Sequence, residues 1–492
     1  MMVHIKRLSK DAAFYGGGRA LSQLFSFILA PIMTAIFSPA EYGIMSLLQT
    51  VFGFMIVIAL INVGSGVFFY FYDTDDKSDK KNIISTSFFF HLIIASFFAT
   101  LIWIFASYFS GLLNIRDIDV DYQDYTKYIR ILSVGLFFSI IKNEFQSVLR
   151  MLRRPKQFFI MTLIEIITGL CLTILLVVVL EKGIEGAFYA GIMTTITACL
   201  VGFFMVKDQY VSKFSFIYLG LFFSYALPQF PSVFFNWGLS QSNRFFLNYY
   251  STLTEQGLYS IGLKVSSVFL LFSIAFRMAW DPFAFSIMKK DHAKETYRKF
   301  YNYYALFFIW AASGVALFGK PLLILLTPIE YHSAYMIIGI LVFAFFLQTG
   351  NNMLGIGISI TKKTKYISYI QAIVFIAVVA LSLFLIPKYD AMGAAFVFLI
   401  GTVIQSILYF VIAEKLHRIN YNFWRMLFFS IIIFTCTQSG LYFLADQNNL
   451  IYSILYASVF MLAITVMIIL MLYNVDKQSL NSALLYLRKR TQ

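Results

Sequence analysis

Long apolar runs alternate with short polar segments along the whole chain. Each run approaches the ~20 residues that an α-helix needs to cross the hydrocarbon core of a bilayer. Because lipid offers no partner to a free backbone N–H or C=O group, such runs must form helices. The pattern therefore predicts an all-α integral membrane protein with fourteen transmembrane helices and no soluble domain. The predicted helices span residues 12–36, 43–70, 85–110, 128–149, 158–181, 184–205, 226–250, 258–286, 301–326, 335–359, 367–387, 391–414, 425–444 and 449–473.

Composition and charge position support a membrane protein. Hydrophobic residues make up 60% of the 492 residues and charged residues 13%, about half the charged fraction of a soluble domain. The segments on the side of the N-terminus hold 27 of the 38 Lys and Arg residues, the opposite loops hold six, and the spans hold five. By the positive-inside rule, both termini are predicted to be cytoplasmic. The net charge of +14 then indicates contact with anionic lipid headgroups and not with nucleic acid.

Three short motifs recur in order at a nearly constant spacing of 207 to 214 residues. They predict a duplicated unit of six helices, with helices thirteen and fourteen appended. Because six is an even number, the two halves share one orientation and can enclose a central cavity, as in many transporters. The matching segments are 41–46 with 255–260, 154–158 with 362–366, and 186–190 with 393–397.

The repeat also predicts the domain organisation. We expect two parallel six-helix lobes over residues 1–205 and 206–415, followed by helices thirteen and fourteen and a cytoplasmic tail over 416–492. The first apolar run lacks a small-residue cleavage site, so it is predicted to be a retained helix and not a signal peptide.

Eight ionisable residues lie inside the predicted spans. Placing one Arg or Lys at the middle of a membrane costs about 2.5–3.5 kcal/mol, so such residues usually serve a function. Five of the eight are cations, and this excess of positive charge predicts a cavity that binds an anion. The candidate substrate-binding residues are Arg19, Lys142, Arg244, Lys264 and Arg277, and the candidate coupling or structural acids are Glu144, Glu165 and Asp281.

Structural explanations compete with anion binding at some of these positions. A cation near the end of a span can reach the interface, and opposite charges on one helix can form a local pair. Arg244 and Lys264 have no acid nearby in the sequence, which favours a functional role. The positions open to a structural explanation are Arg19 at a span end, and the pairs Lys142 with Glu144 and Arg277 with Asp281.

Two prolines interrupt an apolar stretch that is too long for one straight span. Pro228 and Pro231 follow an apolar segment that begins at Phe214. Proline removes a helix hydrogen bond but is tolerated in the first turn. The sequence therefore predicts an interfacial lead-in, a break at Pro228, and then the membrane span.

Patterns typical of catalysis or metal binding are lacking in the sequence. The five histidines are scattered, and the glycines at 16–18 precede no Lys-Ser/Thr pair of the kind that cradles phosphate. We expect no enzyme activity, no metal and no cofactor. Energy for transport would come from proton or sodium coupling, or from downstream use of the product.

An ordered set of motifs spans nearly the whole chain. None of them is specific alone, but their order and spacing resemble the Wzx-type polysaccharide or O-antigen repeat-unit flippases of the multidrug/oligosaccharidyl-lipid/polysaccharide exporter superfamily. The motifs are residues 16–43, 183–187, Leu227-Pro228, Asn236-Trp237, 243–247, 257–260, 280–283 and 389–394.

The resemblance implies a substrate, a place and partners. The substrate would be a polyprenyl-pyrophosphate-linked oligosaccharide, moved by alternating access across the bacterial cytoplasmic (inner) membrane for O-antigen or another surface polysaccharide. Membrane lipid, a polysaccharide polymerase and a chain-length regulator are the expected partners. The family usually has an Asp before the Arg of helix seven, whereas this chain has Asn243, which argues against ion coupling at that position.

Three alternatives stay open at this point. A flippase for lipid II or another lipid-linked glycan would share the fourteen-helix plan and the same headgroup charge. A drug or cation antiporter of the same superfamily would favour an acid-lined cavity, against the excess of cations here. An O-antigen polymerase or ligase would be an enzyme with a large periplasmic loop, whereas the longest outer loop is predicted at about 111–127.

Overall fold

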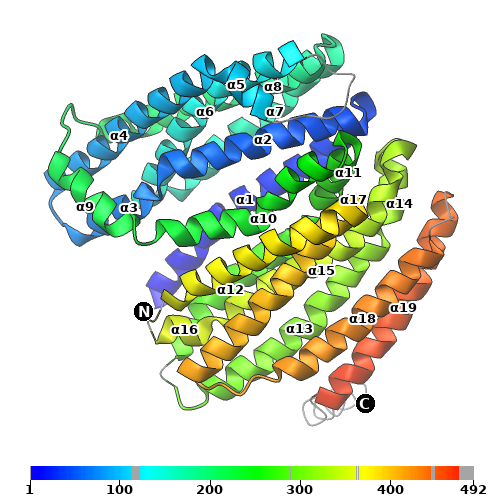
Figure 1. The fold of residues 1–492 in the computed structure, drawn as a ribbon. Coiled ribbons are helices and arrows are strands. Elements are labelled where there is room, and N and C mark those ends of the chain that lie inside the picture. The colour runs from blue at the N-terminus through cyan, green and yellow to red at the C-terminus, as the bar shows by residue number, and fades with distance from the viewer. Residues whose placement is uncertain are drawn as a thin grey trace. The chain divides into compact units, whose positions relative to one another are not determined.

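The described part of the chain is built from helices alone. The structure, a computed structural model, describes residues 2–112, 122–288, 290–361, 363, 365–444 and 449–475. Within these residues there are nineteen α-helices, one π-helix (η1) and two 3-10 helices (η2 and η3), and no strand (Figure 1). The predicted all-α membrane fold is therefore confirmed.

The helices follow the apolar runs closely. Their bounds are α1 Met2–Ile36, α2 Pro39–Leu60, α3 Val63–Asp73, α4 Lys77–Ile104, α5 Ala106–Leu112, α6 Tyr122–Met151, α7 Pro155–Thr173, η1 Ile174–Val179, α8 Gly183–Val206, η2 Lys207–Gln209, α9 Phe216–Ala226, α10 Phe230–Tyr250, α11 Leu253–Ser266, α12 Phe269–Ile287, α13 Ala293–Leu317, α14 Gly319–Leu326, η3 Ile329–Ala334, α15 Tyr335–Leu354, α16 Ile356–Ile360, α17 Lys365–Leu416, α18 Phe423–Phe443 and α19 Leu450–Val475.

The predicted number of fourteen membrane spans stays a prediction. Among the described residues, nine helices are long and apolar enough to cross a membrane, and the bent pairs α9–α10 and α11–α12 raise the number to eleven. The other three predicted spans fall on α1, on α6 and on the second half of α17. In α1 the apolar part is limited to Ala20–Ile36.

Breaks divide some of the predicted runs. Ile61 and Asn62 have positive φ angles of 44° and 57°, a left-handed conformation that stops a helix. The run predicted over 43–70 is therefore not one continuous helix but α2 followed by α3. The two spans predicted over 367–387 and 391–414 are two helices within the range of α17, and they meet at Asp390, where the backbone leaves the helical conformation with φ of 48° and ψ of −130°.

Both prolines lie at the bend that the sequence predicts before the membrane span. Pro228 is in the turn between α9 and α10, and Pro231 is in the first turn of α10, where its missing N–H has no helical partner to lose. The two helices are bent by 56° at this turn. The predicted break at Pro228 is confirmed.

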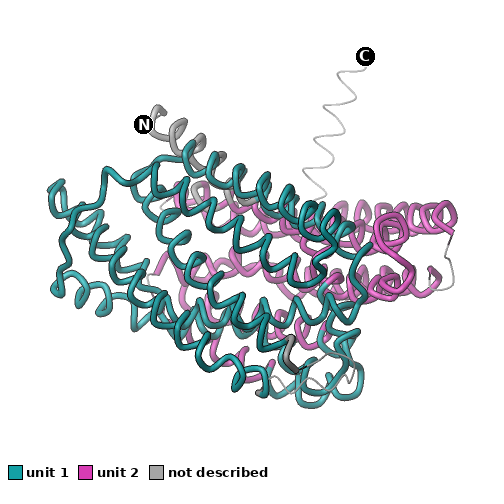
Figure 2. Tube along the Cα trace, turned by 90° about the horizontal axis from the view of Figure 1, so that it is seen from above, with its two compact units in different colours: residues 1–260, 379–394 teal, residues 261–378, 395–492 magenta. Residues whose placement is uncertain are grey.

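Packing divides the chain into two compact units (Figure 2). Unit 1 comprises Met1–Ser260 and Val379–Ala394, and unit 2 comprises Ile261–Val378 and Ala395–Gln492. In unit 1, α6 packs against α4, α7 and α8, and α1 packs against α7. In unit 2, α15 packs against α13 and α18, and all ten of its residues from 337 to 346 are buried. The three predicted domains over 1–205, 206–415 and 416–492 come from the repeat, have other boundaries, and stay a prediction.

Candidate functional site

Two copies of one repeat motif meet in unit 1, where α2 and α11 cross. A Cβ atom built on Gly43 would overlap the carbonyl oxygen of Leu253, and one built on Gly257 would overlap that of Pro39. Both obstacles are backbone atoms that cannot turn aside, so only glycine allows this close approach. Gly43 corresponds to Gly257 in the predicted repeat, as Pro39 does to Leu253. The first motif pair found in the sequence thus forms a contact between the repeats.

A hydrogen bond between equivalent side chains closes the same crossing. The hydroxyl oxygens of Ser46 and Ser260 are 2.5 Å apart, and both side chains are buried. Ser46 and Ser260 are 214 positions apart in the sequence, the spacing of the first motif pair. We call this contact of Pro39, Gly43 and Ser46 with Leu253, Gly257 and Ser260 the α2–α11 crossing.

Arg244 on α10 contacts Thr50, which lies one helical turn beyond Ser46 of the crossing on α2. Its Nη1 atom donates to the hydroxyl of Thr50 at 2.9 Å and to the side-chain carbonyl of Gln241 at 3.0 Å. Thr50 in turn donates to the carbonyl oxygen of Ser46 at 2.8 Å. The Nε atom of Arg244 is buried without a partner. Within the described residues, no carboxylate forms an ion pair with this guanidinium, which agrees with the prediction that Arg244 lacks a neighbouring acid.

Aromatic rings flank the helix face that carries Arg244. The ring of Phe54 on α2 lies 4.9 Å from that of Trp237 and 6.4 Å from that of Phe245, both on α10. Trp237 lies next to Gly53, which has no side chain to fill the space in front of the indole. Unit 1 therefore places an arginine and a cluster of aromatic side chains on the same pair of helices.

Asn243 has a structural role. Its amide donates to the carbonyl oxygen of Ala394 at 2.9 Å and to the Tyr259 hydroxyl at 3.3 Å, and it accepts from Ser382 at 3.5 Å. The side chain is fully buried. A charged Asp at this position could donate neither bond, so the Asn found here ties α10 to α11 and α17 without needing a proton.

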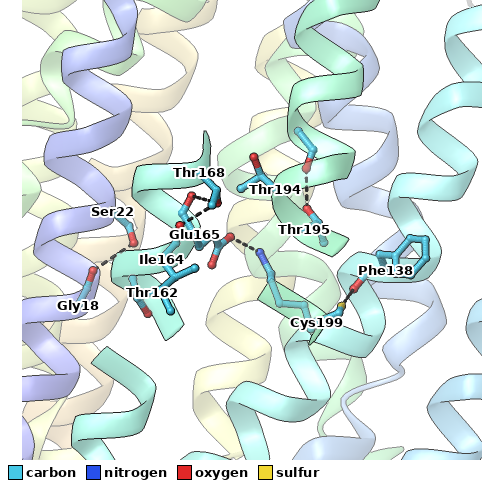
Figure 3. Close-up of polar contacts among 12 residues, drawn as sticks. Gly18, Ser22, Phe138, Thr162, Ile164, Glu165, Thr168, Thr194, Thr195 and Cys199 are labelled. Atoms are coloured by element: carbon cyan, nitrogen blue, oxygen red, sulfur yellow. Dashed lines mark hydrogen bonds and ion pairs between the residues drawn. The ribbon is translucent and has the colours of Figure 1, made fainter. Parts of the chain in front are cut away.

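Lys142 pairs with Glu165 and not with Glu144. Its Nζ atom lies 2.6 Å from Oε1 of Glu165 on α7, and the two side chains are 19% and 24% exposed. Figure 3 shows Glu165 directed from α7 toward α8, where Cys199 donates to the carbonyl oxygen of Phe138. The alternative of a local Lys142–Glu144 pair is wrong, because residues two apart on a helix point to different sides. Lys142 is therefore neutralised in this structure.

Glu144 instead faces α4. Its Oε2 atom lies 2.9 Å from Nδ1 of His91, and the two side chains are only 2% and 4% exposed. His91 is one of the five histidines, which are scattered along the sequence without metal-ligand spacing. No spacing rule joins residue 91 to residue 144, so this pair could be found only from the packing of α4 on α6.

Among the described residues, no contact within one unit joins Arg244 to the remaining candidate ionisable residues. Lys264 lies half-buried in the last turn of α11, next to the bend before α12, and Arg277 lies exposed on α12; both belong to unit 2. The side chains of Arg19 and Asp281 lie outside the described residues. The predicted gathering of five cations and the predicted Arg277–Asp281 pair therefore stay predictions.

Solved structures of transporters share the fold of the chain. The lipid II flippase MurJ in an inward closed conformation matches with a TM-score of 0.71 at 16% identity, over 96% of this chain and 100% of that one. An inward-facing multidrug resistance transporter of the MATE family, in the MOP superfamily, matches with a TM-score of 0.66 at 14% identity, over 81% of this chain and 94% of that one.

A third match is a transporter whose binding pocket has reversed polarity, which suggests a different function for that transporter. This MOP superfamily transporter from Pyrococcus furiosus gives a TM-score of 0.54 at 14% identity, over 84% of this chain and 95% of that one. At these identities the matches establish the fold alone. A sequence comparison with curated proteins found no significant match.

Sequence comparison with protein families is more direct. A family described as "polysaccharide biosynthesis protein" matches residues 32–336. This region covers more than half of the chain and contains the α2–α11 crossing, Arg244, the buried His91–Glu144 pair and the partly exposed Lys142–Glu165 pair. The resemblance to polysaccharide-synthesis proteins, given above from the ordered motifs, is thereby confirmed at the level of this family. The chain is a multi-pass membrane protein with the fold shared by MurJ and the MATE transporters, and it belongs to the polysaccharide biosynthesis protein family.

Proposed function

We propose that the protein is a flippase that moves polyprenyl-pyrophosphate-linked oligosaccharide repeat units across the bacterial inner membrane, for O-antigen or another surface polysaccharide. The observation that carries this proposal is Arg244, a guanidinium at membrane depth whose hydrogen bonds go to the neutral side chains of Thr50 and Gln241. A guanidinium binds phosphate oxygens in a planar, two-pronged arrangement. Arg244 can therefore exchange its neutral partners for a pyrophosphate.

The aromatic cluster supports a glycan next to that anion. Trp237, Phe54 and Phe245 offer flat apolar faces beside Arg244, against which the apolar side of a sugar ring can lie. The prenyl chain would stay in lipid, since burying it in protein gains nothing over hydrocarbon. The pyrophosphate and the sugars are the parts that cannot cross ~30 Å of hydrocarbon alone.

The other cations are proposed to act in different states of the transport cycle. Lys264, Arg277 and Arg19 would bind the pyrophosphate as access alternates, and Lys142 would join only after releasing Glu165. The α2–α11 crossing lies on the predicted periplasmic side of Arg244. We propose that it closes that side, and that Gly43 and Gly257 must part to release the substrate. Both termini are proposed to be cytoplasmic, and a polymerase and a chain-length regulator would use the product.

The chemistry of the headgroup leaves one competing substrate. Lipid II also carries a pyrophosphate and sugars, so Arg244 and the aromatic cluster suit it as well. The flippase is preferred to the enzyme alternative, a polymerase or ligase, because the solved structures that share the fold are those of transporters. The proposal therefore concerns a lipid-linked glycan, and the repeat unit is the preferred one because of the polysaccharide biosynthesis family.

A translocation assay tests the proposal. The purified protein is reconstituted in vesicles with a synthetic polyprenyl-pyrophosphate-linked oligosaccharide that carries a fluorescent label, and the fraction in the outer leaflet is followed by enzymatic removal of the label. We expect translocation of this lipid, and little of labelled lipid II. Equal rates for vesicles with and without protein would overturn the flippase, and a preference for lipid II would overturn the substrate.

A further inference from the structure

A buried acid–base pair lies outside the proposed anion site. His91 on α4 and Glu144 on α6 meet at 2.9 Å, and the Ser87 hydroxyl lies 3.4 Å from the same imidazole nitrogen. Rings of Phe90 and Phe145 stand beside the pair in the sequence and pack into the same bundle. The pair thus has almost no access to water, and the proposed binding of pyrophosphate by α2 and α10 makes no use of it.

Two polar atoms next to this pair have no partner. Oε1 of Glu144 and the hydroxyl of Tyr210 are both buried and without a hydrogen bond in the described part of the chain. The ring of Tyr210 packs 4.7 Å from that of Phe88 and 6.3 Å from that of Phe145, and the charge of Glu144 acts on its hydroxyl. A carboxyl oxygen that is buried and unpaired is unusual, and a negative charge on it would be costly because no donor stabilises it.

Charge arithmetic determines how many protons the pair holds. Without an added proton, Glu144 is an anion beside a neutral ring, and the pair has a charge of −1. With two, it has a charge of +1. With one, shared between carboxyl and imidazole, it is neutral. Burial of a net charge among apolar side chains is far more costly than burial of a neutral hydrogen-bonded pair, so the occluded pair holds one proton.

We propose that His91 and Glu144 form a proton-binding site and that its proton, on the proposed function, is the ion that drives transport. Sodium, like other hard cations, takes oxygen ligands, whereas the partner of the Glu144 carboxylate here is an imidazole nitrogen, and the Ser87 hydroxyl lies 3.4 Å from that same nitrogen. Histidine is the side chain whose ordinary protonation range includes neutral pH. The site therefore selects a proton over sodium.

The loop after η2 provides the exit. The backbone N–H groups of Val211 and Ser215 donate to the hydroxyls of Ser85 and Thr86 on α4, at 2.8 and 3.2 Å. These bonds tie the loop that carries Tyr210 to α4. When they break, water reaches Glu144 and accepts the proton, which leaves a carboxylate and a neutral imidazole. The loop is predicted to be cytoplasmic, so release occurs on that side, and no oxidant or other reactant is needed.

The basic partner of Glu144 is His91, and Tyr210 is a titratable group with a ring contact to the neighbouring Phe145. Several other titratable groups on the elements packed against α4 and α6 have contacts elsewhere: Glu41 with Ser38, Tyr70 and Tyr218 against Phe222, Tyr72 with the Met151 carbonyl, Tyr225 against Phe69, Lys142 with Glu165, Glu185 with Lys127, Cys199 with the Phe138 carbonyl, Asp208 with Arg154 and Lys207 over Phe204, while Tyr108 and Tyr189 are exposed.

Spectroscopy tests the proton site without any assumption about transport. The protein is placed in lipid nanodiscs with ¹⁵N-labelled histidine, and the His91 signals are identified by their loss in His91→Gln. At pH 7 we expect one added proton on the pair, seen either as a cationic His91 ring by NMR or as a protonated carboxyl band by infrared spectroscopy. Glu144→Gln should remove it, whereas Glu165→Gln, which removes an acid paired with lysine, should not. A carboxylate together with a neutral His91 in the wild type would overturn the site.

The double variant His91→Gln/Glu144→Gln tests coupling. Two amides can keep a hydrogen bond between α4 and α6 but cannot bind the proton, so a merely structural role would be preserved. In vesicles with the labelled polyprenyl-pyrophosphate oligosaccharide, an imposed pH gradient should change the initial rate of the wild type and leave that of the double variant unchanged. An equal response of both overturns coupling at this site. If the wild type moves no lipid, the proposed function fails and with it the coupling role, while spectroscopy still decides the proton site.

Discussion

The α2–α11 crossing gives the sharpest mechanical prediction. Alanine at Gly43 adds one methyl group that would overlap the Leu253 oxygen and lie 3.0 Å from its carbonyl carbon and 3.1 Å from the Gly257 nitrogen. All three obstacles are backbone atoms, so the helices must separate. Overpacking of this kind costs typically 1–3 kcal/mol, and we expect the upper end because no side chain can rotate away. Each 1.4 kcal/mol is a factor of ten, so the ratio of closed to open crossings should fall about 100-fold.

Disulfide trapping measures this ratio. The Ser46 and Ser260 oxygens are 2.5 Å apart, so cysteines at these positions should form a disulfide with little adjustment. The variant Ser46→Cys/Ser260→Cys is prepared with the three native cysteines replaced by alanine. We expect Gly43→Ala, and equally Gly257→Ala, to slow its oxidation about 100-fold.

The matched control is Gly64→Ala in α3, because a Cβ atom at Gly64 meets nothing within 4 Å. It should leave the oxidation rate unchanged. If Gly43→Ala and Gly64→Ala gave the same rate, the glycines would not hold the crossing closed, and the argument from backbone overlap would be refuted.

Three further predictions concern side chains of unit 1. Arg244→Gln should weaken binding of inorganic pyrophosphate at least tenfold in calorimetry, because charge-assisted hydrogen bonds are lost; unchanged binding would move the anion site elsewhere. Asn243→Asp should lower the thermal stability in detergent by about 1–3 kcal/mol at pH 8 and by less at pH 5, since only the protonated carboxyl can donate to the Ala394 carbonyl; the opposite pH trend would contradict the hydrogen-bond assignment. Glu165→Gln should destabilise by about 1–3 kcal/mol, less than for a fully buried pair because both partners are partly exposed, and the swap Lys142→Glu/Glu165→Lys should restore most of it; a swap as unstable as the single variant would show that the pair adds nothing.

The local break points were readable from residue types. Pro228 and Pro231 predicted the bend between α9 and α10, because proline has no N–H to donate inside a helix. The left-handed Ile61 and Asn62 were not predicted: Asn adopts this conformation more readily than most residues, but Ile rarely does, and both lie inside an apolar run. The break at Asp390 was predicted, as the short segment between the spans 367–387 and 391–414.

The candidate site was predictable only in part. Arg244 was singled out because a cation at membrane depth is costly and lacked an acid nearby in the sequence. Its partner Thr50 and the aromatic cluster were missed, because Thr and Trp are common in membrane helices and carry no mark of their contacts. Lys142 was assigned to the substrate, whereas in the structure it is paired with Glu165.

The sequence by itself determined that this chain is a helical membrane protein, that it carries a repeat, and that costly charges lie within its spans. These properties follow from the hydrophobicity of each segment, because each segment must by itself be apolar enough to be stable in lipid. Only the tertiary structure decided that Glu144 faces His91, that Lys142 faces Glu165, and that Gly43 touches the backbone before Gly257. Such pairs depend on which faces of two helices pack together, and that is set by the whole bundle at once, not by any one segment.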